Sequence, residues 1–322
     1  MIWEMWNLFL ERSDFFADLL WEHLGISLLA IVIAVLIGGA AGILISEVRG
    51  AAKLTLGVVS FLYTIPSISM LGFLIPFSGV GNATAVIALT VYALLPMVRN
   101  TYAGMTNVDP AILEAAKGMG STRMQVLFKI RLPLAMPVIM SGIRSMVTMT
   151  IALAGIASFI GAGGLGVAIY RGITTNNTAM TMDGSLLIAL LALLMDFLLG
   201  IVERRMTKRS AEAQKVNHRI AAAVLVLCLA GAGVGMFRTR TGDSVHIATK
   251  PMTEQYVLGE MLELLIEQDT DLNVELTQGV GGGTSNIQPA MESGEFDMYP
   301  EYTGTAWNMV LKEDSLYTED LF

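Results

Sequence analysis

The segment at residues 24–46, LGISLLAIVIAVLIGGAAGILIS, runs for 23 residues without a charged side chain. A helix needs about 20 mostly apolar residues to cross the hydrocarbon core of a bilayer. Comparable apolar runs follow at residues 54–77, within 78–98, and at 132–170, 184–202 and 220–237. A buried core helix could explain one such run, but six in series predict a mostly α-helical, polytopic domain with six crossings.

The overall composition supports a membrane domain followed by a short water-soluble one. Hydrophobic residues make up 54% of the 322 residues, and the mean hydropathy is +0.61. Residues 1–237 contain 16 Lys and Arg against 12 Asp and Glu, whereas residues 238–322 contain 4 against 16. The acidic end argues against a nucleic-acid partner. One cysteine excludes a disulfide framework, and the three scattered histidines show no metal-ligand spacing.

The basic residues predict the orientation in a plasma membrane. The connections at 47–53, 99–131 and 203–219 contain 13 Lys and Arg, whereas the alternate set at 1–23, near Gly79 and at 161–183 contains only Arg12 and Arg171. Cytoplasmic loops are the basic ones. We therefore expect both termini, and the acidic domain from Gly242 onward, to be extracellular or periplasmic. Residues 1–23 mix aromatic and acidic side chains, which favours an interfacial segment over a signal peptide.

The connection at 109–133 has the pattern of two short helices joined at a glycine. Asp109 and Pro110 are typical of a helix start. We expect Gly120 to end this first helix, Ser121 to cap a second one, and Pro133 to stop the second helix before the membrane. Such a pair on the cytoplasmic face predicts a docking element, with an ordinary surface hairpin as the alternative.

The same connection resembles the signature loop of ABC importer permeases. The pattern is Glu-Ala-Ala, three residues, Gly, nine residues, Ile-x-Leu-Pro, and its fixed positions are Glu114, Ala115, Ala116, Gly120, Ile130, Leu132 and Pro133. The resemblance implies that this loop couples the permease to a separate ATPase dimer, and that two permease copies pair. The chain has no Gly-x₄-Gly-Lys-Ser/Thr motif, so ATP and magnesium are expected on the partner and no cofactor on this chain.

Further segments within residues 20–205 resemble permeases for glycine betaine, choline and related osmoprotectants, and we place the core of this transmembrane domain at 24–219. These segments are residues 63–67 (YTIPS), 94–102 (LLPMVRNTY) and 160–166 (IGAGGLG). Methionine importers share parts of the last one. Its Gly161-x-Gly163-x-x-Gly166 spacing also fits a dinucleotide-binding fingerprint, but it follows a membrane crossing and not a strand. We interpret it as a glycine-rich turn that closes the outer end of the pathway.

Two ionisable residues, Arg144 and Asp196, interrupt the apolar runs. Ionisable groups inside membrane segments are functional candidates by default. They predict either an internal ion pair or side chains that extend to the membrane boundary.

Residues 244–322, after a polar hinge at 238–243, have the pattern of a partial α/β domain. Strands are expected at 245–249, 273–277 and 296–299, with helices at 254–267 and 287–293 between them. Strand, helix, strand, helix, strand predicts a parallel sheet. Ligands of such sheets bind beyond the carboxyl ends of the strands. The loops at these ends are residues 250–255 and 299–305.

These two strand-end loops resemble the osmoprotectant solute-binding proteins, in which Lys-x-x-Thr-Glu-Gln and Glu-Tyr-Thr-Gly-Thr recur. The resemblance implies that Lys250 and Thr305 hold a carboxylate and that Tyr302 is a wall of an aromatic cage, with Gln255 as a weaker contact. A lone solvated lysine and a packing tyrosine are the alternatives. A complete two-lobed domain is far longer than the 85 residues at 238–322, so we expect a partial periplasmic-binding-protein-like lobe, either a fragment of a longer fusion or a remnant.

Together these features predict the permease subunit of an ATP-driven importer for quaternary-ammonium solutes. An importer for ergothioneine or methionine is the alternative within this class. A membrane receptor without transport is the alternative from another class, but the sequence contains no cytoplasmic output domain. A membrane enzyme is disfavoured because we find no nucleophile, metal or paired-carboxylate constellation.

Overall fold

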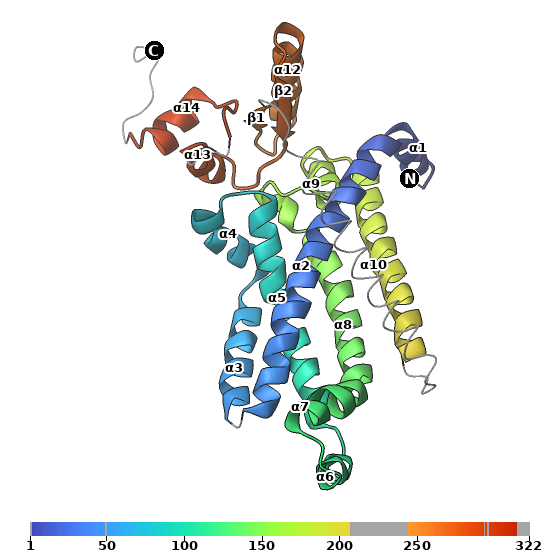
Figure 1. Ribbon diagram of the computed structural model, residues 1–322. Coiled ribbons are helices and arrows are strands. Elements are labelled where there is room, and N and C mark those ends of the chain that lie inside the picture. Colours follow the sequence, from blue (N-terminus) through green and yellow to red (C-terminus); the bar gives the residue numbers. More distant parts are fainter. Residues whose placement is uncertain (1, 49, 207–243, 293, 295, 314–322) are drawn as a thin grey trace.

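The computed structural model describes residues 2–48, 50–206, 244–292, 294 and 296–313. They form a bundle of long helices with a small α/β lobe at one end and a short helical loop at the other (Figure 1). The bundle helices are α1 (Ile2–Glu11), α2 (Ser13–Glu47), α3 (Ala51–Thr64), α4 (Ser67–Ser78), α5 (Asn82–Thr106), α8 (Leu132–Ala154), α9 (Gly166–Thr174) and α10 (Thr178–Met206).

Four of these helices are long and apolar enough to cross a membrane. They are Ser13–Glu47, Asn82–Thr106, Arg123–Ala154 and Thr178–Arg204, and the pair α3 and α4 brings the number to five if it forms one span. The predicted crossing at 220–237, Cys228 within it and the hinge at 238–243 lie outside the described residues.

The predicted crossing at 54–77 is broken, not straight. Helices α3 and α4 meet at an angle of 99°. Ile65 is extended, with φ −67° and ψ 129°, because the ring of Pro66 disfavours a helical conformation in the residue before it. The freed carbonyl of Ile65 accepts a hydrogen bond from the Tyr92 hydroxyl on α5, so the break is held by its neighbour.

Helix α5 lies between α2 and α8 and packs closely against both. A β-carbon on Gly42 of α2 would lie 2.5 Å from the β-carbon of Thr101, and one on Gly142 of α8 would lie 2.3 Å from that of Asn100. Small residues let membrane helices approach to backbone contact, which dispersion then stabilises. These two glycines therefore fix the centre of the bundle.

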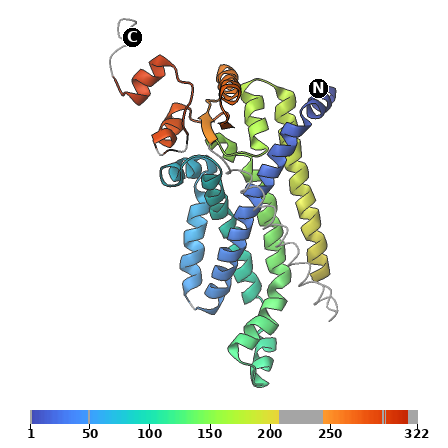
Figure 2. The same cartoon turned by 45° about the horizontal axis from the view of Figure 1, so that its top comes forward.

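The apolar run at 132–170 contains one long helix and then a change of direction. Helix α8 ends at Ala154, and a 3₁₀ turn, η2 (Ala157–Ile160), leads to the glycine-rich turn and α9. The predicted crossing therefore occupies only the first part of this run. Its remainder lies at the end of the bundle that contacts the lobe (Figure 2).

The lobe contains two parallel strands with helices after each. They are β1 (Ser244–Ala248), α12 (Thr253–Asp269), β2 (Asn273–Thr277), α13 (Thr284–Glu292), α14 (Thr303–Thr305) and a π turn, η3 (Ala306–Val310). The strands pair in register from Ser244↔Asn273 to Ala248↔Thr277. The predicted third strand at 296–299 is reduced to one parallel bridge, Ile247↔Met298.

The lobe and the adjacent end of the bundle share a hydrophobic core. One cluster of buried side chains continues from Ile160 and Ala162 of the bundle into Ala248, Val280 and Ile287 of the lobe. Burial of apolar surface is the main favourable term in association. The lobe is therefore packed on the bundle and not merely tethered to it.

Candidate functional site

The 109–133 loop lies at the end of the bundle opposite the lobe (Figure 1). Its first helix, α6 (Pro110–Gly118), begins as predicted, because the Asp109 side chain accepts a hydrogen bond from the Ala111 amide at 2.9 Å. Gly120 has φ +82°, a conformation that costs other residues about 1–2 kcal/mol. Gly120 thus ends the helix through its backbone conformation, since a β-carbon there would meet nothing within 4 Å.

The second half of the loop differs from the prediction in two ways. The cap is Thr122, not Ser121, because Thr122 and Gln125 exchange side-chain and backbone hydrogen bonds as a capping box. Pro133 does not stop the helix. The short α7 (Arg123–Gln125) widens into a π turn, η1 (Val126–Arg131), and continues into α8. The wider turn directly before Pro133 accommodates a residue that cannot donate a backbone hydrogen bond.

The fixed positions of the loop divide into exposed and anchored residues. Glu114, Ala115, Gly120 and Pro133 are exposed, Ala116 is buried, and Ile130 and Leu132 are half-buried. Arg131, which the motif leaves variable, ties the loop to the bundle. Its Nε donates to the Met105 carbonyl at 2.7 Å, and its guanidinium pairs with Glu47 at the end of α2. Sequence reasoning missed this anchor, although Arg131 lies inside the quoted motif.

The glycine-rich turn at 161–166 closes around the side chain of Glu22 from α2. Glu22 accepts hydrogen bonds from the Gly164 amide at 3.0 Å and from the Asn82 side chain at 3.1 Å. Asn82 in turn accepts from the Gly163 amide at 2.9 Å. A β-carbon on Gly163 would lie 1.8 Å from Cδ of Glu22, so a larger residue there would displace the Glu22 carboxylate from this position. The motif follows a 3₁₀ turn instead of a strand, which agrees with the rejection of a dinucleotide site.

Arg144 on α8 and Asp196 on α10 are brought together. Nε and Nη2 of Arg144 donate to the two Asp196 oxygens at 3.1 and 2.8 Å, a bidentate geometry. Nη1 also donates to Glu203 at 2.5 Å. Asp196 and Glu203 are seven residues apart and share one helix face, which is the signal that could have found Glu203. Between them, Gly200 leaves room for the guanidinium, which lies 3.3 Å from where its β-carbon would be.

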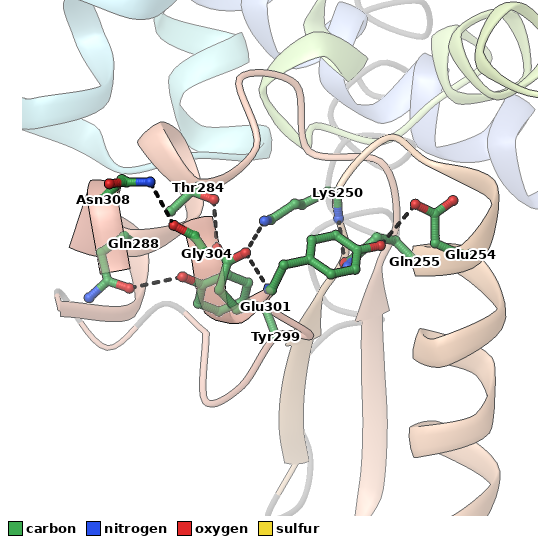
Figure 3. Close-up of polar contacts among 10 residues, drawn as sticks. Lys250, Glu254, Gln255, Thr284, Gln288, Tyr299, Glu301, Gly304 and Asn308 are labelled. Carbon is green, nitrogen blue, oxygen red and sulfur yellow. Dashed lines mark hydrogen bonds and ion pairs between the residues drawn. The ribbon is translucent and has the colours of Figure 1, made fainter. Parts of the chain in front are cut away.

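Lys250 and Tyr302 lie close together in the lobe, as predicted for the two strand-end loops. Figure 3 shows Lys250 beside Glu301. The Lys250 ammonium lies 5.2 Å from the centroid of the Tyr302 ring and forms an ion pair with Glu301. The Tyr302 hydroxyl donates to Glu254 at 2.8 Å. Gln255 is fully buried, and its side-chain oxygen accepts from the Lys250 amide at 3.4 Å. Within the described residues, no hydrogen bond or ion pair joins Thr305 to Lys250.

Glu301 is the functional candidate in this lobe that sequence reasoning did not single out. Burial by itself raises the pKa of Glu301, but hydrogen bonds from Lys250, Thr284 and the Tyr302 amide together hold that pKa below its ordinary value. Thr284 donates to the second carboxylate oxygen at 2.6 Å. Burial, with the nearby Glu301 charge, raises the pKa of the Tyr299 hydroxyl to about 12. The Lys250 ammonium, which we expected to hold a ligand carboxylate, is thus already paired with Glu301 within the lobe.

The comparisons with known proteins agree with this arrangement. Residues 30–208 match the family described as binding-protein-dependent transport system inner membrane component. Residues 243–320 match the substrate binding domain of ABC-type glycine betaine transport systems. The family prediction from the sequence is confirmed.

Among curated relatives, the ergothioneine transport permease/ergothioneine binding protein EgtU of Helicobacter pylori is 40% identical over 81% of this chain. The chain spans only 49% of that relative's length. The carnitine transport permease protein OpuCB of Listeria monocytogenes is 42% identical over 59% of this chain and 87% of its own.

A solved structure of the MetNI methionine ABC transporter, in an inward-facing conformation, has a similar fold. Its matched chain is 26% identical with a TM-score of 0.54, over 58% of this chain and 94% of its own. By its matched family, its permease relatives and its fold, the chain belongs to the inner membrane components of binding-protein-dependent transport systems.

Proposed function

We propose that this chain is the membrane-spanning subunit of an ATP-driven importer for small trimethylammonium solutes, with part of its solute-binding domain fused after the last crossing. The observation that carries the proposal is the placement of two matched elements on one helical bundle. The 109–133 loop lies at one end, and the lobe lies at the other (Figure 1). A solute captured at the lobe and a motor attached at the loop would therefore act on opposite sides of the membrane.

The distribution of basic residues supports a cytoplasmic loop and an external lobe. The connection between α2 and α3 and the connection between α5 and α8, both rich in Lys and Arg, lie at one end of the bundle. Helix α10 runs from the lobe end of the bundle to that same end, whereas β1 lies in the lobe. The predicted sixth crossing at 220–237 would return the chain from the end of α10 to the lobe.

Exposed apolar side chains at the loop support a protein partner there. Ile112, Met119, Met124 and Phe128 are 43%, 80%, 63% and 52% exposed on a face predicted to be in water. Such clusters mark protein interaction sites. We assign this face to a separate ATPase subunit that binds ATP and magnesium. Because each loop engages one subunit, an ATPase dimer would take two permease copies.

The chemistry of the lobe supports a quaternary-ammonium solute. A trimethylammonium group cannot donate a hydrogen bond, so an aromatic face such as Tyr302 is its natural partner. EgtU is an ergothioneine permease and binding protein and OpuCB is a carnitine permease, and both solutes fit this class. Because the Lys250 ammonium has three donors, a solute carboxylate would share it with Glu301, whereas a solute without a carboxylate, such as choline, would leave the pair intact.

The partner assignment is tested by reconstituting the protein in nanodiscs with candidate ABC ATPase subunits. We expect binding of the ATPase at the loop and stimulation of ATP hydrolysis by solute. The loop variant Met119→Glu should lose ATPase binding, while the exposed lobe variant Met261→Glu, at the other end, serves as the control. Equal ATPase binding by parent and Met119→Glu would contradict the proposed docking face.

A further inference from the structure

Arg171 on α9 joins the permease to the lobe by several contacts from one side chain. Its guanidinium donates to Gln278, which follows β2, and lies 3.7 Å from Glu260 on α12. Its Cζ lies 5.2 Å from the ring centroid of Tyr256 on α12 and 5.6 Å from that of Phe15 on α2. The side chain is only 16% exposed. One residue of the permease thus reaches two elements of the lobe.

The lobe residues around Arg171 are themselves connected. The Gln278 amide donates to Glu260 at 2.6 Å, so its oxygen and its nitrogen serve Arg171 and Glu260 respectively. One turn after Arg171, the Thr174 hydroxyl lies 3.2 Å from the Tyr256 hydroxyl. A guanidinium presents several donors and a flat face at once, which suits this set of an amide oxygen, a carboxylate and a ring.

Directly beside these contacts, the two backbones touch. A β-carbon on Gly281 would lie 2.1 Å from the Phe159 carbonyl oxygen, so the lobe can approach η2 only with glycine there. A β-carbon on Gly161 would lie 3.2 Å from the Val280 side chain. The permease side of this contact is the 157–161 segment that leads into the Glu22-bound turn.

The same loop of the lobe also borders the Lys250 cluster. The Val280 amide donates to the Thr249 carbonyl at 2.8 Å, directly before Lys250. Thr284, at the end of this loop, donates to Glu301, the partner of Lys250. Residues 279–284 therefore lie between the candidate solute site and the outer turn of the permease.

The distribution of charge favours Arg171 as the residue that binds the acidic lobe. The connections predicted to be outside contain only two basic residues, Arg12 and Arg171, whereas residues 238–322 contain 16 acidic residues against 4 basic ones. Arg12 lies near enough to Arg171 to repel it electrostatically, but its own side chain is exposed. Arg171 is the one whose side chain contacts the lobe.

We propose that Arg171, with Gln278, Glu260 and Tyr256, forms a docking latch that holds the lobe on the outer mouth of the permease with its solute loop against the 157–161 segment. The proposal deepens the proposed function, since it names the surface through which the lobe delivers its solute. A solute that rearranges the Lys250–Glu301 pair would act on residues 279–284 and so on the outer turn. Coupling of this kind is reciprocal, so the state of the turn would also affect solute affinity.

The test measures docking directly, without solute or transport, so it does not depend on the importer assignment. Spin labels are attached to the cysteines of Thr178→Cys on α10 and Glu267→Cys on α12, two exposed positions, in a chain that also carries Cys228→Ser. We expect one narrow distance population in the parent. Arg171→Ala should replace it with a broad distribution, because the lobe loses the contacts that fix its orientation. Arg12→Ala, which removes the same charge nearby, should keep the narrow population.

Two further variants separate docking from folding of α9. Gln278→Ala lies on the lobe and should broaden the distribution as Arg171→Ala does. The exchange Arg171→Glu with Glu260→Arg should restore the narrow population, because the amide of Gln278 can reverse to serve the exchanged charges. Three results would each overturn the latch. The distance distribution could stay narrow in both Arg171→Ala and Gln278→Ala, or Arg12→Ala could broaden it as much as Arg171→Ala does. The third is an exchange variant whose distribution is as broad as that of Arg171→Glu alone.

Discussion

The left-handed backbone at Gly120 gives a quantitative prediction for the coupling loop. Gly120 has φ +82° and nothing within 4 Å of its missing β-carbon, so a larger residue is opposed by its backbone conformation alone. A non-glycine residue in this region costs about 1–2 kcal/mol, and a β-branched one is worse. Gly120→Val should therefore disfavour the native turn by at least about 5- to 30-fold.

The neighbouring Gly118 offers a matched control on the same surface. Its missing β-carbon also meets nothing within 4 Å, but it lies in α6 with an ordinary backbone conformation. Gly118→Val therefore adds the same side chain without the strain. An alanine at Gly118 should even stabilise the helix, by about 0.5–1 kcal/mol.

The assay is uptake and ATP hydrolysis measured on the same vesicles, with the ATPase partner present. The loop must hold its native turn to dock, so the apparent affinity for the partner falls with the fraction of competent loops. We expect Gly120→Val to lose uptake per ATP hydrolysed while Gly118→Val retains it. Equal coupling in Gly120→Val and the parent would refute the assignment of this turn to coupling.

Three other predictions concern the membrane cluster and the lobe. Arg144→Met should lower the free energy of unfolding in detergent by about 3 kcal/mol, because it leaves the Asp196 carboxylate without its bidentate partner among apolar helices. Asp196→Leu added to it should recover part of the loss, and no loss in the single variant would show that the pair is not structural. Tyr302→Ala should weaken the binding of a quaternary-ammonium solute by about 2- to 30-fold, as measured by calorimetry. Tyr302→Phe should weaken it much less, since phenylalanine keeps the ring face and loses only the hydrogen bond to Glu254. Unchanged affinity in Tyr302→Ala would show that Tyr302 is a packing residue. The pKa of Glu301 is lowered in the folded lobe, so the stabilising contribution of its carboxylate should be complete above the ordinary carboxyl pKa of 4.5. This contribution should be lost as the pH falls through the lowered pKa. If the lobe of Glu301→Gln unfolds with the same acid dependence as that of the parent, this prediction is wrong.

Much of the bundle could be predicted because membrane helices are specified by long apolar runs. The runs at 24–46 and 184–202 lie within α2 and α10, and the start of α6 at Asp109 was found from its capping chemistry. What composition does not encode is where a helix breaks inside an apolar run. The break at Pro66 and the end of α8 at Ala154 depend on local backbone and on packing against neighbours.

The difference in the loop also depends on local backbone conformation. A proline stops a helix only if its missing donor and its ring cannot be accommodated, and the π turn before Pro133 accommodates both. In the lobe, strand β2 was predicted with its observed bounds, whereas the third strand makes a single bridge.

The contacts that sequence reasoning missed are those between distant residues. Glu22 with Gly164 and Arg171 with Gln278 are separated by more than a hundred residues. No periodicity or local motif joins such pairs, so they required the fold. Arg144 and Asp196 could be suggested as partners only because both interrupt apolar runs.

Solute transport by this protein can be measured as ATP-dependent uptake into vesicles that contain the protein and its ATPase partner, with ATP supplied on the side of the 109–133 loop. Labelled glycine betaine, choline, carnitine and ergothioneine are offered separately on the side of the lobe, and methionine serves as the comparison outside the trimethylammonium class. We expect at least one trimethylammonium solute to accumulate in an ATP-dependent manner, and we expect this accumulation to be lost in Gly120→Val. Accumulation of methionine alone would contradict the proposed function. So would ATP hydrolysis by the parent complex without accumulation of any of these solutes.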